Sequence, residues 1–282
     1  MRSVRDLITL SAEYLEKKNI PHPRRSAEDL LAFVLKKKRL ELYFDYDIPI
    51  EDHEIDFFRS LLKRRGVSEP FEYITEEIQF FDCSLTITKD VLIPRQETEI
   101  LLSKAMVAIE KEGGQNKILW DLCSGSGCLG IGAKKKCPEL EVTLSDLSLE
   151  ALSCAQKNIE KNKLNIQTIQ GDLLAPFYGK KAHFILCNPP YISEDEYLTL
   201  DDSVKRYEPK NALISGASGY EFYCRLAHDL PSHLYPGGKV FLEIGSGQGK
   251  MISEIFNQSC WKSKYYESDW AGHDRFFFLE IH

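Results

Sequence analysis

The stretch "KILWDLCSGSGCLG", residues 117–130, decides the fold. A largely apolar run, typical of a buried strand, ends at a glycine-rich turn, after which small and apolar residues open a helix. Gly125, Gly127 and Gly130 follow the pattern G-x-G-x-x-G. Glycine permits the tight bend and lets a ligand approach the backbone, whose free amides at the helix start can donate to it. The stretch predicts the first strand, turn and helix of a nucleotide-binding α/β sheet.

Strands and helices alternate on both sides of this turn. Seven strands are expected, over residues 117–122, 141–145, 166–170, 183–187, 239–244, 262–267 and 275–281. Helices are expected over residues 128–136, 149–162, 218–234 and 249–258. This alternation predicts an α/β fold with a doubly wound, mainly parallel, Rossmann-like sheet. The last two strands have no helix between them, so one of the two should be antiparallel.

The chain before this sheet has a different character. Apolar residues recur at helical spacing in residues 3–19, 26–37 and 51–65, which predicts a small helical bundle over residues 1–73. The stretch 78–93 is rich in β-branched and aromatic residues and has Asp82 at a plausible turn, so a β-hairpin linker is expected over 74–94. The α/β domain then occupies residues 95–282.

The composition and charge of the chain argue against several classes of protein. The net charge is −7, and residues 1–80 hold 14 Lys and Arg against 16 Asp and Glu. Neither part is basic, which disfavours a nucleic-acid substrate. We expect neither a membrane span nor a signal peptide, because no apolar run is long enough. The eight cysteines form no C-x-x-C pair and the histidines are scattered, so we expect no metal site and buried thiols in a reducing cytoplasm.

Three carboxylates near the expected strand ends bear on the ligand. Asp146 ends the second strand, where a carboxylate can accept both ribose hydroxyls of an adenosine. The glycine pattern alone does not choose between a dinucleotide and S-adenosylmethionine. Asp121, just before the glycines, would repel a pyrophosphate and suits a ligand that carries an ammonium group. Asp172 follows the third strand and is placed to meet the adenine edge. Of the three, Asp121 is the residue that favours S-adenosylmethionine over a dinucleotide.

A second stretch, "HFILCNPPYIS" at residues 183–193, suggests the reaction. Two prolines cannot donate to a sheet ladder, so the strand must stop and leave Asn188 at its carboxyl end, where α/β sheets bind ligands. The Asn188 side-chain oxygen and the Pro189 carbonyl can accept the two protons of a planar NH₂ group, and Tyr191 can stack on that group. Asn188, Pro189 and Tyr191 are therefore the predicted catalytic residues, with Pro190 beside them at the substrate. The predicted reaction is methyl transfer to an amide, adenine or guanine nitrogen.

At this point the chain resembles the class I S-adenosylmethionine-dependent methyltransferases. Within them it is similar to the HemK/PrmC family of peptide chain release factor glutamine methyltransferases. The matching stretches are "RRGVSEPFEYI" from Arg64, "VLIPRQETE" from Val91, "DLCSGSG" from Asp121, "NPPYI" from Asn188, "YEPKNAL" from Tyr207, "LEIGSGQG" from Leu242 and "DWAGHDRF" from Asp269. The tetrad Asn188-Pro189-Pro190-Tyr191 is shared with adenine and guanine methyltransferases. The proline-arginine-acid stretch beside a helical domain and hairpin is therefore what indicates this family.

The resemblance implies methylation of the glutamine side-chain amide in the Gly-Gly-Gln motif of release factors, which modulates translation termination. It implies that the helical domain recognises the release factor, and that Arg95 lies near the substrate. The implied cofactor contacts are Cys123, Ser124, Gly125, Ser126, Gly127, Asp146, Asp172, Leu173 and Asn188. The product would be S-adenosylhomocysteine. Gln96, Cys123 and Leu173 depart from the family pattern, and Leu173 replaces an aromatic residue that some members place beside adenine.

Three alternatives remain open on the sequence. An adenine or guanine methyltransferase acting on DNA or RNA would use the same tetrad and would need a basic, aromatic-lined face. A dinucleotide-binding oxidoreductase would use the glycine turn but leaves the tetrad unexplained. A non-catalytic binding module would keep the fold, and the intact tetrad speaks against it.

Overall fold

A computed structural model describes residues 2–282 and separates the chain into two compact units. The first unit comprises the residues up to Glu76 together with Asp202–Tyr207, and the second comprises Glu77–Asp201 and Glu208–His282. The division at Glu76 lies close to the boundary expected at residue 73. The assignment of Asp202–Tyr207 to the first unit was not expected, since no local pattern in that stretch indicates it.

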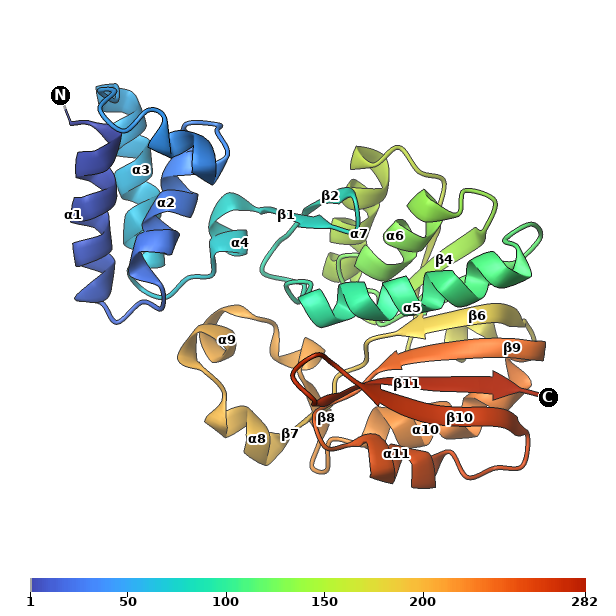
Figure 1. The fold of residues 1–282 in the computed structure, drawn as a ribbon. Coiled ribbons are helices and arrows are strands. Elements are labelled where there is room, and N and C mark those ends of the chain that lie inside the picture. Colours follow the sequence, from blue (N-terminus) through green and yellow to red (C-terminus); the bar gives the residue numbers. More distant parts are fainter. Residues whose placement is uncertain (1) are drawn as a thin grey trace. The chain divides into compact units, whose positions relative to one another are not determined.

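The first unit is mainly a bundle of helices (Figure 1). It has one large apolar core and a smaller buried cluster of Leu15, Ile20 and Ala27. Its helices are α1 Val4–Glu16, α2 Pro23–Val34, α3 Asp52–Arg65, α4 Phe71–Thr75 and α9 Asp202–Tyr207, with a 3₁₀ turn at Arg39–Tyr43. Leu7, Leu30, Leu31 and Phe58 are almost completely buried in the core. Burying such side chains contributes about 1.5–3 kcal/mol each, which explains the apolar spacing seen in the sequence. The Tyr207 hydroxyl donates to the Val67 carbonyl at 3.0 Å and ties α9 to this unit.

The second unit is built on a seven-stranded sheet in the order β10-β11-β9-β6-β3-β4-β5. The strands are β3 Ile118–Leu122, β4 Glu141–Asp146, β5 Gln167–Gln170, β6 Ala182–Cys187, β9 Leu234–Glu243, β10 Trp261–Ser268 and β11 Asp274–Ile281. β3 pairs in parallel with β4 and β6, whereas β11 is antiparallel to both β9 and β10. The predicted doubly wound, mainly parallel fold is confirmed, including one antiparallel strand near the end.

Helices cover both faces of this sheet (Figure 1). On one face lie α5 Gln96–Glu112, α6 Cys128–Lys136 and α7 Leu149–Lys161, and on the other lie α10 Glu221–Asp229 and α11 Gly249–Ile255. Central strands are buried on both faces, so β3 and β6 are mainly apolar, apart from Asp121 in β3 and His183 in β6. The carboxyl ends of β3, β4, β5 and β6 therefore meet at one edge of the sheet, between the two helical layers.

The hairpin consists of β1 Glu77–Phe80 and β2 Cys83–Thr86 and belongs to the second unit. Phe81 and Asp82 both have positive φ, 46° and 62°, as a two-residue type I′ turn requires. The Asn158 side chain on α7 accepts from the Thr86 amide at 2.6 Å and donates to the Thr86 carbonyl at 3.0 Å. These two bonds fix the end of the hairpin against the sheet's helical layer.

Two sequence expectations were wrong in detail. The helix expected over 218–234 ends at Asp229, and β9 begins at Leu234, so Pro236-Gly237-Gly238 lies inside the strand rather than before it. A shift in register between the Ala182–Leu234 and Phe184–Lys239 pairs accommodates the extra residues. The chain after the tetrad also forms β7 Ile192–Ser193, α8 Glu194–Thr199 and β8 Ile214–Gly216, which were not expected. Within residues 2–282, no helix combines the length and apolar character needed to cross a bilayer.

Candidate active site

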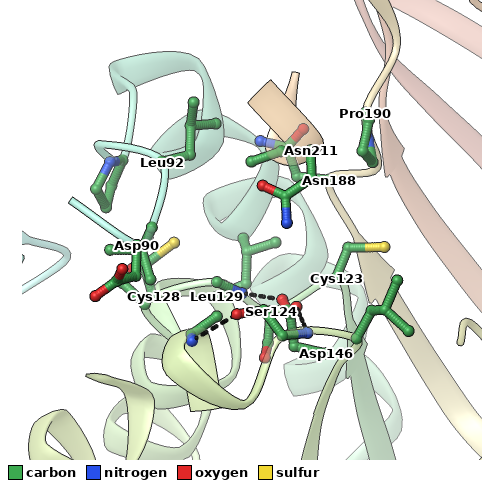
Figure 2. Close-up of a pocket in the computed structure, with 18 of the residues that line it drawn as sticks. Asp90, Leu92, Cys123, Ser124, Cys128, Leu129, Asp146, Asn188, Pro190 and Asn211 are labelled. Carbon is green, nitrogen blue, oxygen red and sulfur yellow. Dashed lines mark hydrogen bonds between the residues drawn. The ribbon is translucent and has the colours of Figure 1, made fainter. Parts of the chain in front are cut away.

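A cavity lies at the carboxyl ends of β3, β4, β5 and β6 in the second unit. Its wall includes nine of the predicted site residues: Cys123, Ser124, Gly125, Ser126, Asp146, Asp172, Leu173, Asn188 and Pro190. Figure 2 shows Asn188 and Asn211 on one side of the cavity and Ser124 and Asp146 on the other. The structure thus brings together residues that lie on four separate strand ends in the sequence.

The glycine loop forms one wall of the cavity through its backbone. Cys123, Gly125 and Gly127 have positive φ of 54°, 53° and 80°. A Cβ on Gly127 would lie 2.8 Å from Leu144 Cδ1, whereas a Cβ on Gly125 would meet nothing within 4 Å. Gly127 is therefore required for packing as well as for the turn, and Gly125 faces open space.

Asp146 braces this loop at the end of β4. Its Oδ2 accepts from the Gly125 amide at 2.8 Å, and its Oδ1 accepts from the Ser148 amide at 2.9 Å (Figure 2). Burial raises the pKa of Asp146, and the two backbone donors act in the opposite direction. Each carboxylate oxygen retains a further lone pair, so Asp146 can accept from a ligand while it holds the loop.

Asp121 lies under the loop and not in the cavity wall. The residue is fully buried, and its Oδ2 accepts from the Gly130 amide at 2.8 Å at the start of α6. Burial raises the pKa of this carboxyl to about 7. Its Oδ1 has no hydrogen-bond partner among the described residues. Asp121 does not line the cavity, so its contact with a ligand ammonium stays a prediction, and its carboxyl group bonds the end of β3 to the first turn of α6.

Asp172 and Leu173 line the cavity beyond the end of β5. The Asp172 carboxylate is half exposed and pairs with Arg225 at 2.7 Å. Leu173 has a φ of 51° and is only 4% exposed, so its side chain packs into the core as well as against the cavity. Phe222, one turn before Arg225 on α10, also lines this wall and supplies an aromatic ring where Leu173 supplies none.

Asn188 reaches the opposite wall from the carboxyl end of β6. Its Nδ2 donates to Thr98 Oγ1 at 3.4 Å, and Thr98 Oγ1 donates to Glu243 Oε2 at 2.7 Å. Thr98 is buried on the first turn of α5, and Glu243 is buried at the end of β9. The side chain predicted to hold the substrate nitrogen is therefore held by a threonine and, through it, by a buried carboxylate.

Three predicted residues contact other parts of the second unit. Within residues 2–282, the cavity wall does not include Pro189, Tyr191 or Arg95. The Tyr191 hydroxyl donates to Glu243 Oε1 at 3.5 Å, and its ring packs against the core of the sheet. Arg95 Nη2 donates to the buried Glu208 Oε1 at 2.5 Å. The stacking role of Tyr191 and the substrate contact of Arg95 stay predictions.

Several residues of the wall were missed by the sequence argument: Asp90, Val91, Leu92, Pro94, Cys128, Leu129, Leu147, Ser148, Ala151, Gly171, Asn211, Ala212 and Phe222. Two kinds of signal were available for some of them. Leu147 and Ser148 directly follow Asp146, and Gly171 directly precedes Asp172, so each lies next to a predicted contact. Asn211 lies within the stretch "YEPKNAL" that resembles the family. Phe222 carries neither signal, because only the tertiary fold brings it to this edge of the sheet.

The residues of this wall fit S-adenosylmethionine. Ser124 Oγ is buried in the wall and has no hydrogen-bond partner among the described residues, so it is available to a polar ligand. The open space above Gly125 admits a ligand close to the backbone, and Asp146 and Asp172 offer acceptors. In residues 2–282 there is no cluster of three His, Cys, Asp or Glu side chains arranged to hold a metal ion.

The sheet order, the glycine turn and the tetrad at the end of β6 define a Rossmann-like methyltransferase. The family described as "Methyltransferase small domain" matches residues 96–204. Among solved structures, the T. thermophilus 16S rRNA N2 G1207 methyltransferase in complex with AdoMet and guanosine superposes with a TM-score of 0.53. Its identity is 16%, over 73% of this chain and 50% of that chain. At that identity the likeness shows the fold alone.

The sequence comparison identifies the family. The family described as "PrmC N-terminal domain" matches residues 6–75. A release factor glutamine methyltransferase of Chlamydia trachomatis is 38% identical over 98% of this chain and 94% of its own length. The enzyme of that name from Thermodesulfovibrio yellowstonii is 34% identical over 91% of this chain and 92% of its own length. The chain belongs to the release factor glutamine methyltransferase family, as the resemblance implied.

Proposed function

We propose that this chain transfers a methyl group from S-adenosylmethionine to the side-chain amide nitrogen of glutamine in the Gly-Gly-Gln motif of peptide chain release factors. The observation that carries the reaction type is the position of Asn188 at the end of β6, across the cavity from the glycine loop. The substrate class comes from relatives that match along nearly the whole chain and carry that name. We further propose that the helical unit recognises the release factor.

The residues of the wall, together with Pro189 between Asn188 and Pro190, divide into two roles in this proposal. Ser124, Gly125, Asp146, Asp172 and Leu173 hold the adenosine and amino-acid parts of the cofactor, which supplies an electrophilic methyl group when bound. Asn188 Oδ1 and the Pro189 carbonyl accept the two N–H groups of the substrate amide. Such preorganised acceptors fix the nitrogen in line with the methyl group, and positioning of this kind supplies much of a rate enhancement.

Proton transfer follows bond formation in this scheme. An amide nitrogen is a weak nucleophile because its lone pair is delocalised, and two acceptors on its hydrogens favour a geometry in which that lone pair faces the methyl carbon. As the N–C bond forms, the C–S bond breaks and its electron pair remains on sulfur. The nitrogen then carries a positive charge and releases one proton to solvent, so no general base has to act beforehand.

Methyl transfer from labelled S-adenosylmethionine tests the proposal. The substrates are an unmodified release factor, its Gln→Ala variant in the Gly-Gly-Gln motif, duplex DNA and ribosomal RNA, offered in parallel. We expect label on the release factor only, and none on the variant. Label on DNA or RNA alone would overturn the substrate and leave the cofactor assignment standing. A variant release factor labelled as well as the natural one would overturn the site of methylation.

A further inference from the structure

Glu243 is a buried carboxylate that the proposed reaction does not use directly. It is 2% exposed at the end of β9. Its Oε2 accepts from the Thr98 hydroxyl at 2.7 Å and its Oε1 accepts from the Tyr191 hydroxyl at 3.5 Å. Burying a carboxylate costs stability unless it is hydrogen-bonded or paired, and an apolar side chain is often at least as stabilising, so a role for Glu243 other than stability is worth seeking.

Thr98 connects this carboxylate to Asn188. A threonine hydroxyl has one hydrogen, and here it is donated to Glu243, so Thr98 Oγ1 can only accept from Asn188. The Asn188 carboxamide must then present its NH₂ group to Thr98. Its oxygen is left for the cavity, which is the orientation needed to accept from a substrate N–H group.

We propose that Glu243 is a positioning residue that acts through Thr98 to turn the Asn188 side-chain oxygen toward the substrate. The proposal rests on the function proposed above, because it presumes that Asn188 must accept. It requires Glu243 to be ionised, since only a carboxylate is restricted to accepting from Thr98. A protonated Glu243 can donate to Thr98 instead. The threonine hydrogen can then point at Asn188, whose amide would turn its NH₂ group into the cavity.

The groups around Glu243 decide when it is ionised. The pKa of Glu243 is raised to about 7, mainly by burial and in smaller part by Glu97 on α5. The hydrogen bond from Thr98, the charge of Arg275 on β11 and the nearby Asn188 side chain act in the opposite direction. The remaining titratable neighbours, Tyr191, Tyr223 on α10 and Cys128 on α6, have pKa values raised by burial and stay neutral. Glu243, Thr98 and Asn188 form a hydrogen-bond relay. As pH falls through about 7, this relay should cease to hold the Asn188 side-chain oxygen toward the substrate.

Two variants of Thr98 separate the relay from packing. Thr98→Val keeps the shape and removes the hydroxyl, whereas Thr98→Ser keeps the hydroxyl and removes a methyl group. We expect kcat to fall about 10- to 100-fold in Thr98→Val, with the KM for S-adenosylmethionine within about twofold. Thr98→Ser should recover most of that loss. Equal losses in both variants, or a normal kcat in Thr98→Val, would overturn the relay.

The pH profile tests Glu243 itself. In the unsubstituted protein, kcat should decline as pH falls below about 7. Glu243→Gln retains an oxygen that can accept from Thr98 but does not titrate, so its kcat should be lower and nearly flat from pH 6 to 8. The same decline in both proteins would assign the titration to another group and overturn the inference.

A readout without turnover distinguishes this inference from the proposed function. The Asn188 side-chain NH₂ signals in ¹⁵N-labelled full-length protein can be assigned by their loss in Asn188→Ala. They should shift with a midpoint near pH 7, and the shift should vanish in both Glu243→Gln and Thr98→Val. A shift of this kind in a protein that does not label release factors would keep the relay and reject the substrate. A labelled release factor together with Asn188 signals that do not change with pH would keep the substrate and reject the relay.

Discussion

The two sides of the cavity are held in place in different ways. On the glycine-loop side, Asp146 bonds to backbone amides of Gly125 and Ser148, and its carboxylate remains at the cavity surface. On the Asn188 side, the bonds run from side chain to side chain and end at a carboxylate that is out of reach of solvent. Backbone contacts tolerate changes of side chain, whereas a side-chain relay fails when any member is lost. Cofactor binding should therefore be the robust property of this site and orientation of the substrate the sensitive one.

The largest effect is expected for Asn188→Ala. This change removes the acceptor on the sensitive side and leaves the glycine loop intact. Loss of one preorganised hydrogen-bonding group typically lowers kcat by about 10²–10³. Methyl transfer to the release factor should fall by that factor, while the Kd for S-adenosylmethionine from calorimetry stays within about threefold. Near-normal turnover would remove Asn188 from catalysis, and lost cofactor binding would mean that the two sides are not separable.

Asp146→Ala tests the other side and should have a smaller effect of a different kind. It removes a ligand acceptor and frees the amides of Gly125 and Ser148, so the KM for S-adenosylmethionine should rise about 10- to 100-fold, which is about 1.4–2.7 kcal/mol of binding. The kcat at saturating cofactor should change little. Glu150→Ala is a matched control, because it removes an exposed carboxylate four residues further on, in the first turn of α7, that does not line the cavity. An unchanged KM in Asp146→Ala would take Asp146 out of the cofactor site.

Sequence reasoning predicted the two sides unequally, for a physical reason. The glycine loop and Asp146 were found because a strand, a turn and a strand end are local patterns, and the parallel sheet brings such ends to one edge. Glu243 was not among the predicted site residues. Its partner Thr98 is 145 residues away in the chain, and Asn188 is 90 residues from Thr98. A hydrogen bond between distant residues leaves no periodicity in either segment.

The same distinction between local sequence patterns and contacts of distant residues explains the errors in the predicted fold. The strands were predicted because most of them are short runs rich in apolar, β-branched or aromatic residues and bounded by turn residues. Pro236-Gly237-Gly238 was read as a break, yet pairing with β6 tolerates it by a shift in register. The segment that carries α8 and α9 has few apolar positions, and its two helices have no buried residues. Tertiary contacts such as the bond from Tyr207 to Val67, which no local pattern records, hold part of it.

Two buried carboxyl groups, one on each side of the cavity, should make the stability of the protein depend on pH. Burial raises the pKa of both Asp121 and Glu243 to about 7, above their ordinary values of 3.8 and 4.5. A carboxyl whose pKa is raised by folding binds its proton more tightly in the native state. Its contribution to stability is therefore full below about pH 4 and is lost as pH rises through about 7. The free energy of unfolding should decline over this range by up to about 1.4 kcal/mol per pH unit for each group.

Urea titrations between pH 5 and 7, followed by tryptophan fluorescence, measure this decline. All three tryptophans, Trp120, Trp261 and Trp270, belong to the second unit, so the signal reports the unit that holds both carboxyls. The Asp121→Asn, Glu243→Gln double variant should show a shallower decline than the unsubstituted protein. Identical slopes would mean that neither carboxyl has a raised pKa, and the pH dependence inferred for the relay would lose its basis.

The smallest effect is expected at the outer edge of the cavity, for Arg225→Gln. Arg225 and Asp172 form a pair in which both side chains are about half exposed, at 46% and 47%, and such pairs contribute about 0–1 kcal/mol. The substitution should change the free energy of unfolding by less than about 0.5 kcal/mol. It frees the Asp172 carboxylate for the adenine edge, so the KM for S-adenosylmethionine should stay the same or fall.

Asp172→Asn is the matched change on the partner, and it should raise that KM. A large rise in Arg225→Gln would show instead that the guanidinium contacts the cofactor. Binding of the cofactor's adenine would then depend on a side-chain contact, as the orientation of Asn188 does. Only the glycine loop and Asp146 would remain as the robust part of the cofactor site.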